Sequence, residues 1–344
     1  MTNLNYLKNL NTHTRDSSIN LDESTHTYTI DGETDYISVT SWNHSHFEAF
    51  DSDRIIKRMM SGKNWKESKY YGMDAEQIKN LWNKNRDEAS TAGTKMHFDI
   101  ECFYNKIPVN NTSIEFLYFK NFEKDHPNLK PYRTEWMIYD KDIRMAGSID
   151  IIWKNEDGTY TLGDWKRCSK ILKTNNWAHA KTMCIQHIED CNFWHYSLQL
   201  WAYKTILEKN YQIEIKNMFL ICLHPNNENN SYIKYEIPDL SKEIKNLFEI
   251  RYYEINGSLQ YRLPKLIQEY LKNKSAIKKL FLLQDKLLEK IYNLDEDFED
   301  EIELDSISFQ GKTFYLDKSN NYIYNIQDEL IGIWFQDKIK YFVK

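Results

Sequence analysis

The sequence predicts an α/β protein in which a mixed central sheet is flanked by helices, with helical additions and a small C-terminal β module. Two observations lead to this prediction. Apolar runs on both sides of an Asp-Gly turn at residues 155–158 form a β-hairpin pattern over residues 145–167. Long stretches of helical periodicity lie before the hairpin, over residues 73–104, and after it, over residues 192–209.

The composition is that of a globular protein. Of the 344 residues, 41% are hydrophobic and 28% are charged, and no stretch approaches the roughly 20 apolar residues of a membrane span. The N-terminus has no apolar core or cleavage pattern, so neither a secretory signal nor membrane association is expected. Five cysteines without framework spacing predict free thiols and an intracellular, reducing compartment. Because the net charge is −6, any surface that binds nucleic acid must be local.

The chain is expected to consist of four segments. They are a loose polar N-terminal segment (1–23), a main domain with helical additions (24–294), an acidic linker (295–305) and a β module of three or four strands (306–344). The linker is expected because eight of its residues are acidic, and a run of like charges favours an exposed, extended segment. The β module is a candidate contact for a protein partner or for a second copy of the chain.

The other elements of the main domain follow from local periodicity and turn residues. In chain order they are a small hairpin (26–30 with 36–39), a helix with an aromatic loop (51–71), a helix (113–126), a strand (132–139), two paired strands (213–223 and 231–237) and two helices (241–253 and 264–294).

Two segments are basic in spite of the negative net charge. Between Arg54 and Lys69, six Lys and Arg residues stand against one Glu, and aromatic residues are interleaved with them. Between Asp164 and Lys181, five Lys and Arg residues stand against one Asp. Basic residues beside aromatic ones suit contact with phosphates and bases. A solvated helix face with core aromatics is the alternative interpretation of the first segment.

The central hairpin carries three side chains of a catalytic type. Asp150 lies on its first strand, and Asp164 and Lys166 lie on its second. Side chains alternate along a strand, so Asp164 and Lys166 share a face, and the turn can bring Asp150 beside them. Two carboxylates that converge are costly unless a cation holds them. The hairpin therefore predicts a site for Mg²⁺ or Mn²⁺.

The helix predicted over residues 73–104 adds His97 and Glu101, which are four residues apart and share a face. Alone, such a pair is more often a satisfied surface pair than a set of ligands. An imidazole in the ligand shell would suit Mn²⁺ better than Mg²⁺.

These motifs together resemble the PD-(D/E)XK nuclease superfamily, and within it the RecB-like exonuclease branch. In order they are Gly93-x3-His97-x2-Ile100-Glu101, Glu135, Gly147-Ser148-Ile149-Asp150, Asp164-Trp165-Lys166 and Gln199-x3-Tyr203. The resemblance covers about residues 24–224. It implies an αβββαβ core and metal-dependent hydrolysis of DNA, by an exonuclease that acts on ends or single strands in replication, recombination or repair.

The resemblance also implies roles for individual residues. His97, Asp150 and Asp164 would be metal ligands, Lys166 the catalytic lysine and Glu101 a supporting carboxylate. Asp164 stands where many relatives carry Glu, and its shorter arm could alter the metal spacing.

Further residues are expected around this set. Gln199 and Tyr203 would face the substrate or steady Lys166, and Glu135 would either lie near the metal or end a strand. The residues expected to contact substrate are Gln199, Tyr203, Ser148, Arg167, Lys170, Lys63 and Trp65.

Several alternatives stay open on the sequence alone. The same site could cleave RNA as an endonuclease, or the chain could bind nucleic acid without catalysis. The cysteines lack the grouping of the iron–sulfur cluster that some relatives carry. Cys184, His187, Cys191 and His195 leave a remote possibility of zinc. The abundance of Asn, Lys and Ile resembles large DNA viruses, which would place the protein in the host cytoplasm or nucleus.

Overall fold

The computed structural model describes residues 4–257 without a break. Beyond them it describes residues 272–274, 276–280, 283–284, 304–309, 312–317, 322–325, 330–335 and 338–341. The chain divides into two compact units, Met1–Leu271 and Lys272–Lys344. The sequence placed the end of the main domain later, at residue 294.

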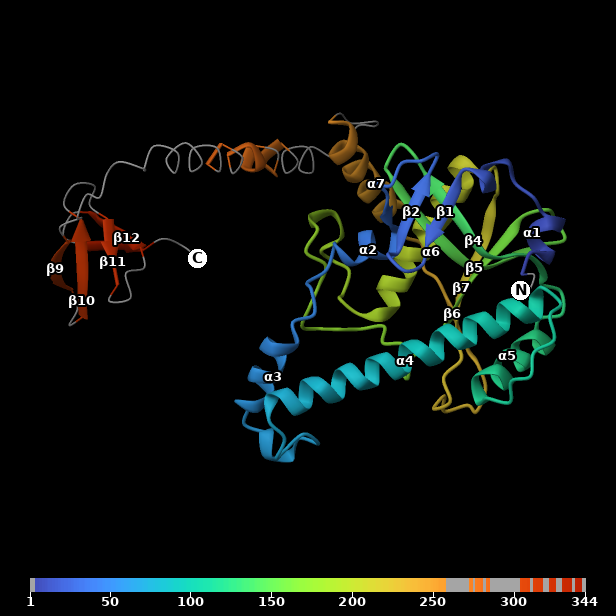
Figure 1. Ribbon diagram of the computed structural model, residues 1–344, viewed down its shortest axis with the longest axis horizontal. Helices are drawn as coiled ribbons and strands as arrows, with labels where there is room; N and C mark the ends of the chain where they lie inside the picture. Colours follow the sequence, from blue (N-terminus) through green and yellow to red (C-terminus); the bar gives the residue numbers. More distant parts are fainter. Residues whose placement is uncertain are drawn as a thin grey trace. The chain divides into compact units, whose positions relative to one another are not determined.

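The first unit is a mixed α/β structure (Figure 1). Its helices are α1 (Tyr6–Leu10), α2 (Val39–His44), α3 (Ser52–Met60), α4 (Ala75–Tyr104), α5 (Ile114–Asp125), α6 (Asn192–Asn210) and α7 (Ser241–Asn256). Its strands are β1 (Ile19–Asp22), β2 (Thr27–Ile30), β3 (Ile37–Ser38), β4 (Lys130–Asp140), β5 (Met145–Lys154), β6 (Tyr160–Lys166), β7 (Ile215–Cys222) and β8 (Ile233–Glu236).

Strand β5 is the centre of a six-stranded mixed sheet. One edge of β5 pairs with antiparallel β4 along almost its whole length. The other edge pairs with two different strands, with parallel β3 at Met145–Ala146 and with antiparallel β6 at Ile151–Lys154. Residues 147–150 therefore have no ladder partner on that edge, and beyond Gly163 strand β6 is paired with parallel β7 alone. The sheet forks at this point, and Asp150 lies at the fork.

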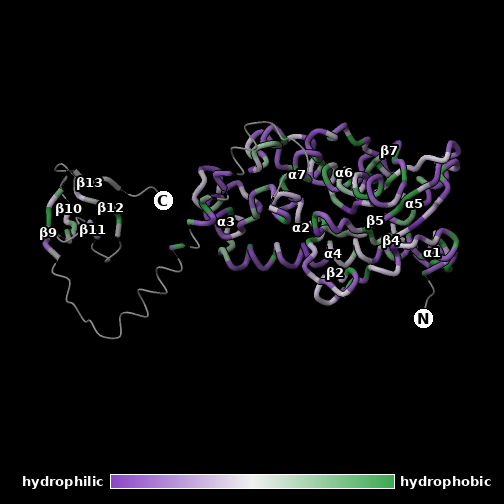
Figure 2. The backbone as a smooth tube through the Cα atoms, turned by 90° about the horizontal axis from the view of Figure 1, so that it is seen from above, coloured by the Kyte–Doolittle hydropathy of each residue, from purple (hydrophilic) through white to green (hydrophobic). Residues whose placement is uncertain are grey.

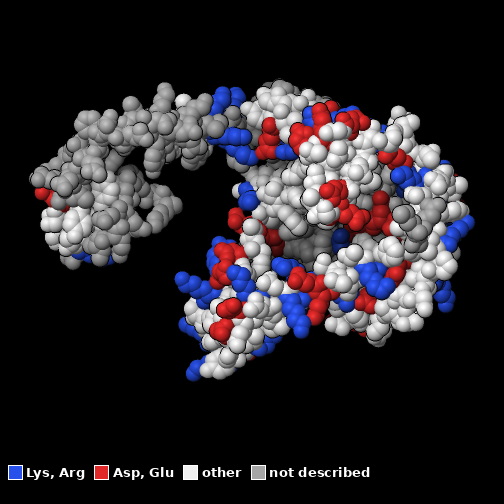
Figure 3. All heavy atoms as spheres, in the orientation of Figure 1, with Lys and Arg blue, Asp and Glu red and all other residues white. Residues whose placement is uncertain are grey.

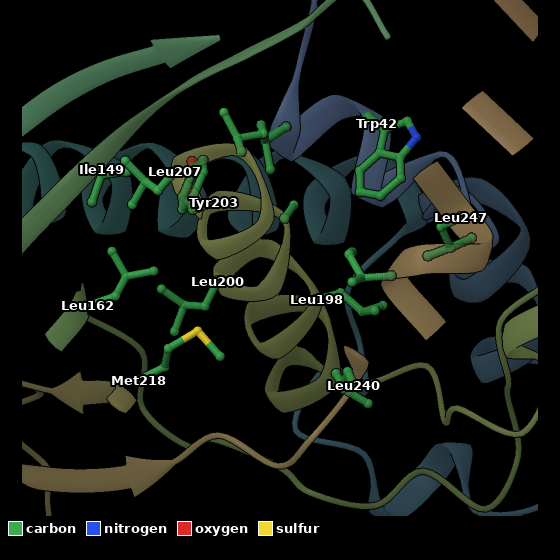
Figure 4. Packing of buried hydrophobic residues seen from close by; sticks show 14 of the residues in the cluster. Trp42, Ile149, Leu162, Leu198, Leu200, Tyr203, Leu207, Met218, Leu240 and Leu247 are labelled. Atoms are coloured by element: carbon green, nitrogen blue, oxygen red, sulfur yellow. The ribbon is translucent and has the colours of Figure 1, made fainter. Parts of the chain in front are cut away.

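Two apolar clusters hold the helices onto the two faces of the sheet. One cluster joins β5 and β6 to α2, α6 and α7, and Figure 4 shows Ile149 and Leu162 facing Leu200 and Leu207 of α6. The other cluster joins the sheet to α4 and α5 through Trp153 and Trp165, which are both fully buried. The prediction of a mixed central sheet flanked by helices is confirmed.

Gly163 allows the two strands of the hairpin to pack against Trp153. A Cβ atom at residue 163 would lie 2.3 Å from the Trp153 ring. We expect Gly163→Ala to lower the free energy of unfolding by at least about 1–3 kcal/mol, because the buried ring and the strand must both shift. Urea denaturation of the two proteins measures this difference.

Gly93→Ala is the matched control for this substitution. Gly93 lies inside α4, and a Cβ atom there would meet nothing within 4 Å. Alanine is the better helix former, so this variant should gain up to about 1 kcal/mol. Equal stability of the wild type and Gly163→Ala would show that the ring contact is not needed.

The N-terminal segment is ordered, so the prediction that residues 1–23 are loose is wrong for the residues described from position 4 onward. Leu7 is buried at 3% exposure. The Asp16 carboxylate pairs with Arg133 at 2.8 Å and accepts a hydrogen bond from the Trp136 indole at 2.8 Å. The polar composition misled the prediction, because these polar side chains are bonded to β4 and do not face solvent.

The predicted pairing of residues 26–30 with 36–39 is also wrong. Strand β2 pairs with β1, which the sequence did not predict, and β3 pairs in parallel with β5. The turn at Asp31-Gly32 does form, with an isolated bridge from Ile30 to Glu33. The chain then leaves β2, because the Ile37 N–H donates to the Arg144 carbonyl beside β5.

The second unit contains a five-stranded antiparallel sheet with the order β13-β12-β11-β10-β9. Its strands are β9 (Leu304–Phe309), β10 (Lys312–Asp317), β11 (Tyr322–Tyr324), β12 (Leu330–Phe335) and β13 (Lys338–Tyr341). The sequence predicted three or four strands and placed Asp305 in the linker, whereas Asp305 belongs to β9. Residues 295–303 of the predicted linker lie outside the described residues. So does most of the predicted helix 264–294, of which residues 272–274, 276–280 and 283–284 are helical.

No helix in the described part of the chain combines the length and the apolar character that crossing a membrane requires.

Candidate metal centre

Four elements deliver the predicted site residues to the fork in the sheet. Helix α4 carries His97 and Glu101, β4 carries Glu135, β5 carries Asp150, and β6 carries Asp164 and Lys166. The helix is 30 residues long and begins at a capping box, in which the Asp74 and Gln77 side chains each accept the other's backbone N–H. Only the second half of α4 packs on the sheet, and Figure 2 shows much of its first half as hydrophilic.

His97, Glu135 and Asp150 form the metal-ligand group that the structure brings together. The Nδ1 atom of His97 lies 3.5 Å from Asp150 Oδ2 and 3.7 Å from Glu135 Oε1. One ligand atom from each of the three residues lies within 4.8 Å of the other two. All three side chains are partly covered, with exposures of 28%, 35% and 13% for His97, Glu135 and Asp150.

Glu135 lies in the middle of β4, so the alternative that it ends a strand is wrong. Its neighbours Thr134 and Trp136 pair with Ile151 and Ile149 of β5, which leaves Glu135 opposite Asp150. Its φ is +43°, a left-handed conformation that a non-glycine residue adopts at a cost of about 1–3 kcal/mol. This strained backbone accompanies the approach of the Glu135 carboxylate to His97. A positive φ cannot be recognised from residue types.

Ser148 positions Glu135. Its hydroxyl donates to Glu135 Oε2 at 3.1 Å, from the neighbouring strand. The sequence assigned Ser148 to substrate contact, and in the structure its bond is made to the metal-ligand group.

Asp164 and Lys166 form a buried ion pair beside this group. Lys166 Nζ lies 2.7 Å from Asp164 Oδ2, and the two side chains are 17% and 3% exposed. Trp165 between them points into the core, and its backbone N–H donates to Asp150 Oδ2 at 2.8 Å. The sequence expected Asp164 among the metal ligands, whereas the group that the structure brings together has Glu135 in that place.

The cluster is held together by charges of both signs. Burial lowers the pKa of His97, but Asp150 and Glu135 outweigh this effect and raise it to about 9. Burial also lowers the pKa of Lys166, and Asp164 and Asp150 more than restore it, so the ammonium is charged. The pKa of Asp164 is raised by burial, against the opposing effect of Lys166. The positively charged side chains of His97 and Lys166 thus face the converging carboxylates.

Glu101 and Glu23 extend the acidic cluster into a cleft. The cleft has a volume of about 660 Å³ and is lined by Glu23, His97, Glu101 and Glu135 among others. Burial raises the pKa of Glu101 to about 7, and the charges of Glu135 and Glu23 add to the shift. Figure 3 shows one face of this unit, with acidic side chains around a hollow beside α4. Glu23 was not predicted, because β1 was not recognised.

Tyr203 belongs to the core and not to the substrate surface. It is 3% exposed, and its ring lies over Gly147, where a Cβ atom would come within 2.7 Å of Tyr203 Cε1. Gln199 donates to the Tyr203 hydroxyl at 3.0 Å. The pair therefore supports the strand that carries Asp150, and a contact between Tyr203 and substrate is excluded by burial.

The other residues predicted to contact substrate differ in how accessible they are. Arg167 pairs with Glu115 at 2.7 Å, which occupies its guanidinium. Lys170 and Lys63 are exposed. Trp65 is half-buried and packs edge-on against Tyr71, at 6.0 Å between ring centroids.

The residues considered for zinc do not form a group. His187 pairs with Glu243 at 3.1 Å, and His195 pairs with Asp190 at 2.8 Å. Within the described residues, His97, Glu135 and Asp150 are the one set of three that could hold a metal ion.

The donor set suits a hard divalent cation. Two carboxylates and one imidazole converge. Two further carboxylates lie close enough for the group to raise their pKa values, that of Glu101 through Glu135 and that of Asp164 through Asp150. The protonated imidazole of His97 supplies positive charge beside these carboxylates, as a bound metal ion would.

We expect the affinity for Mn²⁺ to rise as the pH increases from about 6 to about 9. The cation must displace protons from His97, with a pKa of about 9, and from Glu101, with a pKa of about 7. Calorimetric titrations in two buffers of different ionisation enthalpy measure the number of protons released. The His97→Gln variant should bind Mn²⁺ more weakly and with a flatter pH dependence. An affinity that does not change with pH would remove His97 from the ligand set.

The sequence matches no family model and no curated protein. Among solved structures, one titled "Crystal structure of SSO0001" is similar to 67% of this chain and 80% of its own, at 14% sequence identity and a TM-score of 0.25. A similarity this distant leaves the function to be inferred from the site itself.

Proposed function

We propose that this chain is a deoxyribonuclease that depends on a divalent cation and has a PD-(D/E)XK core. The observation that carries the proposal is the convergence of His97, Glu135 and Asp150 at a fork in the sheet, next to the buried pair of Asp164 and Lys166. A carboxylate cluster with a charged lysine at its side is suited to phosphodiester hydrolysis.

The order of the elements supports the proposed core. Helix α4 precedes the three consecutive strands β4, β5 and β6, and α6 then leads to β7, which pairs in parallel with β6. This is the αβββαβ order that the motif resemblance implies, although α5 is inserted between α4 and β4.

His97, Glu135 and Asp150 would hold the cation. Mg²⁺ or Mn²⁺ bound there would offset the charge of a phosphate group and make a water molecule more acidic. Neighbouring groups of the chain hold the two carboxylate ligands in place. Trp165 holds the Asp150 carboxylate through its backbone N–H, and Ser148 holds the Glu135 carboxylate.

Lys166 would stabilise negative charge on the phosphate oxygens in the transition state. Its ammonium is charged, is fixed by Asp164 and lies 4.6 Å from the centre of the Tyr196 ring. A charged ammonium donates hydrogen bonds and cannot accept a proton. Of the two roles open to this lysine, charge stabilisation is therefore favoured over abstraction of a proton from water.

Glu101 would exchange a proton during the reaction. Its pKa of about 7 lies where a group can both accept and donate a proton at neutral pH. It also lines the cleft beside Glu135. A role as general acid or base fits these properties better than a passive supporting role.

The nucleic acid would enter across the two basic segments. Arg54, Lys57, Arg58, Lys63, Lys66 and Lys69 lie on α3 and the loop that follows it, and within the described residues none has a carboxylate within 4 Å. Unpaired cations of this kind attract phosphates in a way that weakens with salt. DNA and an exonuclease mode follow from the motif resemblance, and the acidic cleft is equally able to act on RNA.

One experiment tests the proposal. DNA and RNA of the same sequence, single- and double-stranded and labelled at one end, are incubated with the full chain in Mn²⁺, Mg²⁺ or EDTA. We expect cleavage of DNA with either cation, a ladder that shortens progressively from one end, and no cleavage in EDTA. Faster cleavage of RNA at internal positions would favour the endonuclease alternative. Binding without cleavage under every condition would favour a non-catalytic nucleic-acid-binding protein.

A further inference from the structure

Trp177 is the most exposed large apolar side chain in the described part of the chain. It is 94% exposed, against 73% for Phe50 and 65% for Leu10. It lies in the segment that leaves the active strand β6 after Lys166 and leads to α6. In Figure 1 this segment, drawn in yellow-green, extends from the sheet on the side where α3 lies. An indole this exposed contributes almost nothing to the core, and its ring faces are open to a ligand.

The backbone beneath Trp177 is fixed by hydrogen bonds. The Asn175 side chain accepts from the Trp177 N–H at 3.3 Å and donates to the Asp190 carbonyl at 2.6 Å. On the other side of the tip, Ala180 N–H donates to the Ile188 carbonyl at 2.9 Å. Because the backbone that carries Trp177 is already held, only the side chain has to become ordered when a ligand covers it. Trp177 is thus prepared to bind a flat partner.

The charge around Trp177 identifies the class of partner. Residues 167–181 contain four Lys and Arg and no Asp or Glu. Lys170, Lys173 and Lys181 are exposed, and no described carboxylate lies within 4 Å of their ammonium groups. The nearby acids have partners of their own, since Glu189 accepts from the Asn175 backbone and Asp190 pairs with His195. An exposed aromatic surrounded by lysines is complementary to a base and its flanking phosphates.

We propose that Trp177 stacks on an unpaired nucleobase of a strand whose phosphates contact Lys170 and Lys181. The identity of the strand as substrate rests on the proposed function, whereas the stacking contact does not require catalysis. Bases in a duplex are stacked on each other, so only an unpaired base offers a free face to the indole. This contact would make the site prefer single strands or frayed ends, and Trp177 follows Lys166 by eleven residues in the chain.

The test measures binding in EDTA, where hydrolysis does not interfere. Fluorescently labelled single-stranded DNA of 20 nucleotides and a blunt hairpin duplex of equal length are titrated with the full chain. Trp177→Ala should weaken binding of the single strand by between about 5-fold and about 150-fold and should change duplex binding less than about 2-fold. Trp177→Phe should retain most of the affinity, and Leu10→Ala, at another exposed apolar position, should retain all of it.

A second variant separates stacking from charge. Lys170→Gln/Lys181→Gln should weaken binding of both the single strand and the duplex and should reduce its dependence on salt. No loss in Trp177→Ala, an equal loss on the duplex, or no binding of either DNA by the wild type would each overturn the proposal. Trp177-dependent binding by a chain that cleaves nothing in Mn²⁺ would support the stacking site and refute the proposed hydrolysis. Cleavage in Mn²⁺ together with unchanged binding in Trp177→Ala would support the proposed hydrolysis and refute the stacking site.

Discussion

Asp150→Asn should reduce cation-dependent cleavage by at least about a thousandfold while leaving the fold intact. Asp150 links the two parts of the site, because it lies 3.5 Å from His97, accepts the backbone N–H of Trp165 and shifts the pKa values of Asp164 and Lys166. Removal of its charge weakens both the binding of the divalent cation and the stabilisation of negative charge on the phosphate group. Initial rates on end-labelled DNA in Mn²⁺ measure the loss.

The asparagine variant is the informative one, because it keeps the shape of the side chain. Its amide oxygen can still accept the Trp165 N–H, so the free energy of unfolding should change by no more than about 1 kcal/mol. Asp157→Asn is the matched control, since Asp157 is an exposed aspartate of the same hairpin that pairs with Lys216. Retention of more than a tenth of the activity in Asp150→Asn would refute the proposed centre.

Lys166→Met should abolish cleavage and should also destabilise the cation-free protein. The substitution leaves the Asp164 carboxylate, at 3% side-chain exposure, without its only ion-pair partner among the described residues. An unpaired buried charge costs about 3 kcal/mol when it stays ionised. The pKa of Asp164 is already raised by burial, and loss of Lys166 raises it further. The destabilisation should therefore grow as the pH rises above the ordinary range of an aspartate, and it should be small in acid.

The double variant Asp164→Asn/Lys166→Met separates stability from catalysis. It removes both charges, so the free energy of unfolding at pH 8 should return to within about 1 kcal/mol of the wild type. Cleavage should not return, because the Lys166 ammonium that would face the phosphate is still absent. Denaturation curves at pH 5 and pH 8, together with cleavage rates, test both statements. Full activity in Lys166→Met would refute the role proposed for this lysine.

The sequence predicted the parts of the site that are close together along the chain. Asp164 and Lys166 are two residues apart on one strand, and an Asp-Gly turn joins them to Asp150, so alternation was enough to place them. His97 and Glu101 followed from helical periodicity. These contacts are local or one hairpin apart, which is the range over which residue patterns carry geometric information.

The parts that the sequence did not predict depend on long-range pairing. Glu135 reaches His97 through a left-handed backbone, and Glu23 reaches the cleft from the turn between β1 and β2, a strand pair that was not recognised. Tyr203 was expected to face the substrate or steady Lys166 because it completes the Gln199-x3-Tyr203 motif, but Gly147 leaves room for its ring inside the core. Sequence patterns do not show which side chain a distant glycine admits.

The bonds of Asp16 determine how far this protein can be shortened. Asp16 holds Arg133 and Trp136, the residues two before and one after Glu135, and the Arg133 side chain is only 4% exposed. Farther toward the N-terminus, the Leu7 N–H donates to the Asn105 side chain at 3.0 Å, at the end of the helix that carries His97. A fragment that starts at residue 24 would lose both ties and would leave a buried guanidinium without its carboxylate. The smallest fragment able to keep the ligand group in place therefore begins before Leu7.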